Sequence, residues 1–79
     1  MFYTYALKSL TDGHLYIGLT QDVEKRLKEH NTGKTRSTRN RLPFRLIYQE
    51  SFNTRLEARQ KEKYLKSGIG REFLKSLQT

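Results

Sequence analysis

Five side chains suited to phosphate chemistry are spread along the chain: Tyr5, Tyr16, Arg26, His30 and Glu62. A guanidinium binds phosphate oxygens through paired donors and stays charged at physiological pH. One carboxylate, completed by water and phosphate oxygens, can hold Mg²⁺ or Mn²⁺, because Mg²⁺ keeps several of its waters when it binds. A tyrosine can act as a base only where nearby cations or metal-bound water lower its pKa from about 10, and this basic chain supplies cations. The set therefore fits hydrolysis of a phosphodiester bond.

The overall charge points to a polyanionic partner. The chain has 16 Lys and Arg residues against 8 Asp and Glu residues, so its formal net charge is +8 at pH 7. Cationic side chains displace condensed counterions from phosphates, so nucleic acid, DNA above all, is the predicted partner. An anionic membrane surface, or a basic surface that serves only solubility, is the alternative.

With 79 residues, the chain has the length of a single small domain, 1–79, with a modest core. Five tyrosines and four phenylalanines supply bulky core material. The lack of cysteine excludes disulfides and thiolate metal sites, and it favours an intracellular, cytoplasmic protein. The first residues lack the layout of a signal peptide, and no apolar run approaches a membrane span, so no membrane association is expected.

The first part of the chain has the pattern of a β-hairpin. Residues 2–10 and 15–19 are rich in β-forming side chains, and the Asp-Gly pair at 12–13 is a hairpin turn signal. Alternation along the second strand places Tyr16 and Gly18 on the same side. The two tyrosines could also be ordinary half-buried residues of a sheet, where tyrosine is common.

A helix follows, and it carries two of the candidate residues on one face. It is expected to begin at a cap formed by Thr20 or Asp22 and to end near Glu29. Arg26 and His30 are four residues apart, so they share a face. Taken alone, an arginine on a helix usually lies at the surface, and a histidine at a helix end more often complements the helix dipole than takes part in catalysis.

The segment 34–45 is strongly basic and has no acidic residue. Its basic residues are Lys34, Arg36, Arg39, Arg41 and Arg45. Ser and Thr are interspersed among them, and Pro43 lies near the end. We expect a mobile loop that contacts a phosphate backbone without reading bases, which implies weak sequence specificity.

A third strand is predicted over 44–51. Alternation places Phe44, Leu46 and Tyr48 on one of its faces and Ile47 on the other.

Two helices complete the chain. The Thr-x-x-Glu spacing of residues 54–57 predicts a capping box and a helix over 55–66. Ser67-Gly68 ends this helix, and a last short helix covers 71–77. The order β-β-α-β-α-α predicts an α+β fold, in which a small antiparallel sheet of about three strands is flanked by helices.

Two glutamates of the helix 55–66 compete for the metal-binding role. Glu57 has a sufficient structural role at the third helical position of the capping box. Glu62 has no cap to form, and it borders the buried stripe that contains Ala58, where a carboxylate is costly unless it is paired or binds a metal. We therefore prefer Glu62. Its structural alternative is an ion pair with Lys66, one helical turn away.

The order of these residues resembles the GIY-YIG nuclease family. Tyr16-Ile17-Gly18 stands as an intact second motif, whereas Tyr3 and Thr4 replace the Gly and Ile of the first. The resemblance covers nearly the whole chain and is closer to small stand-alone bacterial members, which are similar to the N-terminal domain of the excision-repair nuclease subunit. An asparagine that several branches place after the metal-binding helix has no clear counterpart.

The resemblance implies a role for each of the five candidates. Tyr5 would be the general base or would align the attacking water, and Tyr16 would hydrogen-bond water or phosphate beside it. Arg26 would bind the scissile phosphate, and His30 would assist Tyr5 or the water. Glu62 would hold Mg²⁺ or Mn²⁺.

A second set would contact the nucleic acid. Gly18 would let the backbone approach closely, and Lys34 and Lys66 would contact phosphates. The full predicted set is Gly18, Lys34, Arg36, Arg39, Arg41 and Lys66.

The predicted function is a metal-dependent endonuclease that acts on DNA, has little sequence specificity and selects for structure, with a role in DNA repair. The alternatives are a non-catalytic DNA- or RNA-binding module on the same fold and a basic RNA-associated protein. The sequence leaves open whether the protein is a monomer or a weak homodimer.

Overall fold

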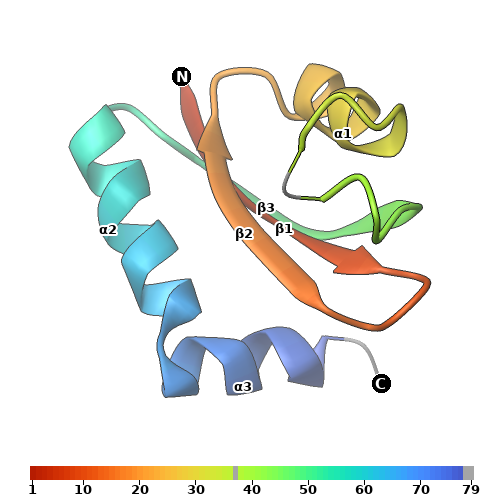
Figure 1. Ribbon diagram of the computed structural model, residues 1–79. Coiled ribbons are helices and arrows are strands. Elements are labelled where there is room, and N and C mark those ends of the chain that lie inside the picture. The colour runs from red at the N-terminus through yellow and green to blue at the C-terminus, as the bar shows by residue number, and fades with distance from the viewer. Residues whose placement is uncertain (37, 78–79) are drawn as a thin grey trace.

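The computed structural model describes residues 1–36 and 38–77 and shows one antiparallel sheet with helices on both faces (Figure 1). The elements are β1 Phe2–Ser9, β2 Leu15–Thr20, α1 Val23–Asn31, β3 Phe44–Phe52, α2 Arg55–Lys66 and α3 Gly68–Ser76. The predicted α+β class and the order β-β-α-β-α-α are confirmed. In the described part of the chain, no helix is long and apolar enough to span a membrane.

The strand order is β2-β1-β3, so β1 lies between two antiparallel neighbours. The hairpin between β1 and β2 turns at Gly13, whose φ of 77° is a left-handed conformation that glycine adopts without strain. The Asp12 carboxylate accepts a hydrogen bond from the backbone N–H of His14 and fixes this turn. β2 is left as an edge strand, which matters because the candidate residues gather along it.

The sheet separates two small cores. On one face, α1 covers a cluster of Tyr5, Leu7, Val23 and Phe44. On the other face, α2 and α3 cover a cluster of Ala6, Ile17, Leu65 and Leu74. Neighbouring residues of β1 thus serve opposite cores, as the alternation of a strand requires.

The prediction for the faces of β3 is wrong at one residue. Tyr48 packs with Ile47 on the α2 face, not with Phe44 and Leu46 on the α1 face. Ala6 pairs with Tyr48 and the next residue of β1 pairs with Leu46, so Ile47 is an extra residue in the ladder. This β-bulge shifts the alternation by one position.

The last helix begins earlier than predicted, at Gly68 instead of Arg71. Ser67 ends α2 through its N–H, which donates to the Tyr64 carbonyl, and it caps α3 by accepting from the Gly70 N–H. A Cβ at Gly70 would lie 2.1 Å from the Tyr64 carbonyl oxygen, so only glycine permits this tight corner. The Ser-Gly pair therefore ends one helix and starts the next.

The described residues of the basic segment after α1, predicted to be a mobile loop, form hydrogen bonds at several points. The backbone N–H groups of Thr38 and Arg39 both donate to the Thr35 carbonyl. The Asn31 side chain exchanges two hydrogen bonds with the backbone of Phe44. Thr38 is a buried residue of this segment, and the sequence pattern did not single it out.

Candidate active site

A cleft of about 410 Å³ opens along the edge strand β2, between α1 and the α2–α3 pair. It is lined by Tyr5, Leu15, Tyr16, Ile17, Gly18, Leu19, Arg26, Arg55, Arg59, Glu62, Lys66 and Arg71. The cleft brings together four of the five predicted catalytic residues, and His30 lies against Tyr5. Of the predicted phosphate contacts, only Gly18 and Lys66 line it.

Gly18 allows the Tyr5 side chain to reach the cleft. The two residues are paired across β1 and β2, and the Tyr5 ring lies over the glycine. A Cβ at position 18 would lie 2.6 Å from the Tyr5 hydroxyl oxygen, so any larger residue would displace the ring. The sequence suggested that Gly18 makes room for nucleic acid, but the space over it is occupied by Tyr5.

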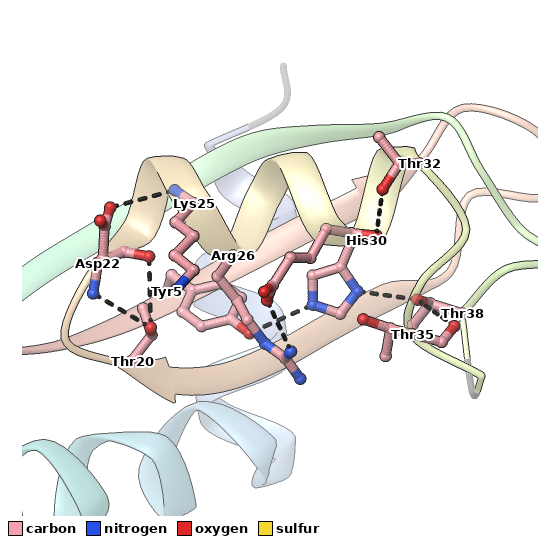
Figure 2. A network of polar contacts seen from close by, with 10 residues as sticks. Tyr5, Thr20, Asp22, Lys25, Arg26, His30, Thr32, Thr35 and Thr38 are labelled. Carbon is pink, nitrogen blue, oxygen red and sulfur yellow. Dashed lines mark hydrogen bonds and ion pairs between the residues drawn. The ribbon is translucent and has the colours of Figure 1, made fainter.

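The Tyr5 hydroxyl lies between His30 and Arg26 (Figure 2). Its oxygen is 3.3 Å from Nε2 of His30, and the Arg26 guanidinium faces the same hydroxyl. Burial raises the pKa of the Tyr5 hydroxyl above its ordinary value of 10, and the hydrogen bond with Arg26 offsets only part of this rise. Because Tyr5 is only 2% exposed, the effect of desolvation on this pKa exceeds the opposing effect of Arg26. Tyr5 is protonated at neutral pH.

His30 is completely buried behind Tyr5. Its Nδ1 is 2.8 Å from the Thr38 hydroxyl, and its ring meets the Tyr16 ring edge-on at 4.8 Å between centroids. Burial, with the charge of Arg26, lowers the pKa of His30 below its ordinary value of 6.5, so the ring is neutral at pH 7. A neutral imidazole does not complement the dipole of α1. Of the two roles that the resemblance implied, this geometry fits assistance to Tyr5.

Arg26 is held at the mouth of the cleft. Its Nη1 is 3.1 Å from Oε1 of Glu29, one turn further along α1. The Arg26 side chain is 36% exposed. Part of the guanidinium is thus free to bind an anion, while Glu29 and Tyr5 fix its direction.

Glu62 lies across the cleft on α2. The Thr4 hydroxyl donates to the Ala58 carbonyl at 2.6 Å, and this buried bond docks α2 against β1 one turn before Glu62. The Glu62 side chain is only 16% exposed, and its Oε2 accepts from Nζ of Lys66 at 3.2 Å. The ion pair expected as the structural alternative is therefore present within the cleft itself.

Glu57 belongs to the capping box at the start of α2. The Thr54 hydroxyl accepts from the Glu57 N–H at 3.2 Å and donates to Oε1 of Glu57 at 3.0 Å. Glu57 is exposed and is not among the residues that line the cleft. The capping role predicted for it is confirmed.

The chemistry of the cleft fits one divalent cation only if the ligand set is completed from outside the protein. No group of three or more His, Cys, Asp or Glu side chains with metal-binding geometry occurs within residues 1–36 and 38–77. Glu62 is the one carboxylate in the described lining. Mg²⁺ tolerates such a site, because it is commonly held by one or two carboxylates, waters and substrate phosphates.

Three charged residues of the cleft were not predicted from the sequence: Arg55, Arg59 and Arg71. A signal for two of them was present. Residues 55, 59, 62 and 66 follow the i, i+4, i+7, i+11 spacing of a single helix face, which extends the face that carries Glu62. Arg71 follows the corner at Ser67, and its place depends on the direction in which α3 leaves that corner.

Residues 1–72 match the family model described as the GIY-YIG catalytic domain. The chain belongs to the GIY-YIG family. This is a family of nucleases, and the matched residues 1–72 include all the residues that line the cleft. The family as a whole generally uses divalent metals.

Relatives of this GIY-YIG protein are small bacterial proteins named UPF0213. It is 54% identical over 65 residues to one from Bacillus licheniformis, covering 81% of this chain and 66% of that protein. It is 49% identical over 65 residues to one from Streptococcus agalactiae, covering 81% and 73%. Among solved structures, the UPF0213 protein of Bacillus halodurans matches with a TM-score of 0.58 and 41% identity, over 98% of this chain and 85% of that one.

Proposed function

We propose that the protein is a divalent-metal-dependent endonuclease that hydrolyses phosphodiester bonds in DNA with little sequence specificity and a preference for particular DNA structures. The observation that carries this proposal is the meeting of the Tyr5 hydroxyl, the Arg26 guanidinium and the Glu62 carboxylate in one cleft. These groups supply a proton acceptor, a phosphate clamp and a metal ligand, which phosphodiester hydrolysis requires. A role in DNA repair, a cytoplasmic location and the monomer or weak homodimer remain predictions.

Tyr5 and His30 would handle the proton as a pair. As the water oxygen bonds to phosphorus and the bond from phosphorus to the leaving oxygen breaks, the water would give a proton to the Tyr5 hydroxyl oxygen, while the hydroxyl's own proton would move to Nε2 of neutral His30. The leaving oxygen would take a proton from solvent. The Nδ1–H of His30 donates to the Thr38 hydroxyl throughout. This transfer needs no phenolate beforehand, so it accommodates the raised pKa of Tyr5.

Arg26 would bind the scissile phosphate, with Tyr16 beside it at the edge of β2. Glu62 would hold Mg²⁺ or Mn²⁺, which when bound supplies charge stabilisation on the phosphoryl oxygens. Lys66, the present partner of Glu62, is free to turn to a phosphate once a metal takes its place. Because these groups read phosphates and not base edges, weak sequence specificity follows.

A non-catalytic binding module on the same fold is the alternative. The replaced first motif, with Tyr3 and Thr4, was the feature that favoured it. The structure gives Thr4 a structural role in the docking of α2, and neither residue is among those that line the cleft. The replacements therefore leave the reacting groups in place, and the nuclease is the better-supported function.

The test is a cleavage assay with plasmid DNA, nicked and flap DNA, and RNA, each in Mg²⁺, Mn²⁺ or EDTA. The wild type is compared with Glu62→Ala and Arg26→Ala, after thermal melts show that both variants are folded. We expect metal-dependent cleavage of DNA that both substitutions abolish. Binding without cleavage across all metals and substrates would overturn the proposal in favour of the binding module, and cleavage in EDTA would refute the metal requirement.

A further inference from the structure

One face of α2 is charged along its whole length. Arg55, Arg59, Glu62 and Lys66 recur every three or four residues, and all four line the cleft. Arg71 continues the row at the start of α3. The row therefore runs past the candidate catalytic carboxylate on both sides.

The charges of this row are poorly compensated within the protein. The described lining of the cleft holds five cations, counting Arg26, against the single carboxylate of Glu62. Arg55 and Arg59 are exposed and form no ion pair with the residues that the structure describes. Like charges held a turn apart on a helix repel each other, so this arrangement costs stability unless an anion binds there.

The row is long enough to reach several phosphates. An α-helix rises 1.5 Å per residue, so Arg55 and Lys66 are separated by about 16 Å along α2. The phosphates of one strand of duplex DNA follow each other at about 3.4 Å along the helix axis, so a row that lies parallel to this axis spans about five nucleotides. Glu62 lies inside this span, with Arg59 before it and Lys66 after it.

We propose that Arg55, Arg59, Lys66 and Arg71 form a phosphate track that binds the nucleic-acid backbone on both sides of the scissile bond. This inference rests on the proposed function and deepens it, because it names the surface that holds the substrate. It also differs from the expectation that the segment after α1 supplies the main backbone contacts.

The segment after α1 offers a matched comparison. Arg36 and Arg39 are exposed arginines like Arg55 and Arg59, but they do not line the cleft. Two pairs of equal charge can thus be neutralised in the same chain, one beside the candidate catalytic groups and one away from them.

The experiment measures binding of a fluorescently labelled DNA duplex by anisotropy, in EDTA to prevent cleavage, over a range of NaCl concentrations. The proteins are the wild type, Arg55→Gln with Arg59→Gln, and Arg36→Gln with Arg39→Gln. The slope of log K against log[NaCl] changes by about 0.9 for each lost phosphate contact. We expect the slope of the α2 pair to flatten by about two units and that of the 36/39 pair by less than about one unit.

The outcomes separate the track from the proposed function. The track is refuted if the Arg55/Arg59 variant has the slope of the wild type, or if the Arg36/Arg39 variant has a slope flattened by the same amount. This holds even where the wild type cleaves DNA. If the predicted slopes appear but the wild type cleaves nothing, the track stands and the nuclease proposal fails. If the wild type does not bind DNA, the track is refuted. Each single substitution, Arg55→Gln or Arg59→Gln, should give about half of the change, which keeps the test decisive if the double variant folds poorly.

Discussion

On the α1 side of the cleft, the polar groups satisfy one another inside the protein, whereas on the α2 side they face solvent with few partners. Tyr5, His30 and Thr38 form a buried hydrogen-bonded chain, and Arg26 is held by Glu29. On α2, the exposed Arg55 and Arg59 precede Glu62, whose only ion-pair partner among the described residues is Lys66 of the same helix. The α1 side of the cleft, the first wall, is held by bonds within the protein before any ligand binds. The α2 side, the second wall, has charged groups that a bound ligand can pair with.

This difference divides the expected effects of substitution. A prearranged group contributes most in the transition state, so its loss should lower the rate and leave binding nearly unchanged. An exposed cation contributes screened attraction to phosphates, so its loss should weaken binding and its salt dependence. The predictions below test whether the two walls behave in these two ways.

The largest effect is expected at the hydroxyl of Tyr5. Tyr5→Phe should lower the single-turnover cleavage rate by about 10²–10⁴-fold, because it removes the proton acceptor, while DNA affinity stays close to that of the wild type. Tyr3→Phe is the matched control, since Tyr3 packs on the same face of β1 without lining the cleft. Equal rates for the two variants would contradict the role of Tyr5.

A methyl group at Gly18 should have the next largest effect. Gly18→Ala places a Cβ where the Tyr5 hydroxyl now lies, and a displacement of about 1 Å at a reacting group can cost about 10²-fold in rate. Gly68→Ala is the control, because a Cβ there meets nothing within 4 Å. Single-turnover rates and DNA affinity are measured for both variants, and we expect Gly18→Ala to lose rate and keep its affinity. An unchanged rate for Gly18→Ala would show that the position of the Tyr5 ring does not matter.

On α2, a substitution at Glu57, which does not line the cleft, should change stability and not activity. Glu57→Ala removes the partner of Thr54 in the capping box and should lower the free energy of unfolding by roughly 0.5–2 kcal/mol, as loss of a cap does. Urea denaturation measures this change, and the cleavage rate per folded molecule should be retained. Loss of activity at full stability would mean that Glu57, and not Glu62, is the essential carboxylate.

The buried wall should also make stability depend on pH. The pKa of His30 is lowered in the folded state by burial and by Arg26, with Glu29 opposing, and Tyr5 and Tyr16 are the other titratable groups against the ring. Below the ordinary histidine pKa of about 6.5, the unfolded chain takes up a proton that the folded protein resists. Stability should therefore fall as pH decreases from about 7.5 to about 5.5.

Urea midpoints across this pH range measure the loss. His14→Gln is the control, because His14 is exposed on the hairpin turn and its replacement should leave the pH dependence in place. A stability that is flat over this range would show that His30 is not held neutral by burial.

Much of the architecture follows from local patterns that a sequence displays. The Asp-Gly turn and the Thr54 capping box each act over a few residues and form as predicted, and the helix cap expected at Thr20 or Asp22 forms at Asp22. The i, i+4 relation of Arg26 and His30 also holds, because helix periodicity alone sets it.

The features that the sequence did not reveal depend on contacts between distant segments. The bulge at Ile47 arises from the pairing of β3 with β1, and it moves Tyr48 to the other face. The burial of His30 depends on Thr38 closing over it from the following segment. The pKa of Tyr5 depends on this same burial, which raises it although Arg26 lies beside the hydroxyl.

If the α1 side and the α2 side of the cleft form a single active site, Tyr5 and Glu62 act as a unit, and a double-mutant cycle measures whether they do. Single-turnover cleavage rates in Mg²⁺ are measured for the wild type, Tyr5→Phe, Glu62→Gln and the double variant, with DNA binding measured in the same samples. Residues that act as a unit are strongly non-additive, so we predict that the double variant is little slower than the slower single variant. Rate losses that multiply, or a single variant that cleaves like the wild type, would contradict a shared site.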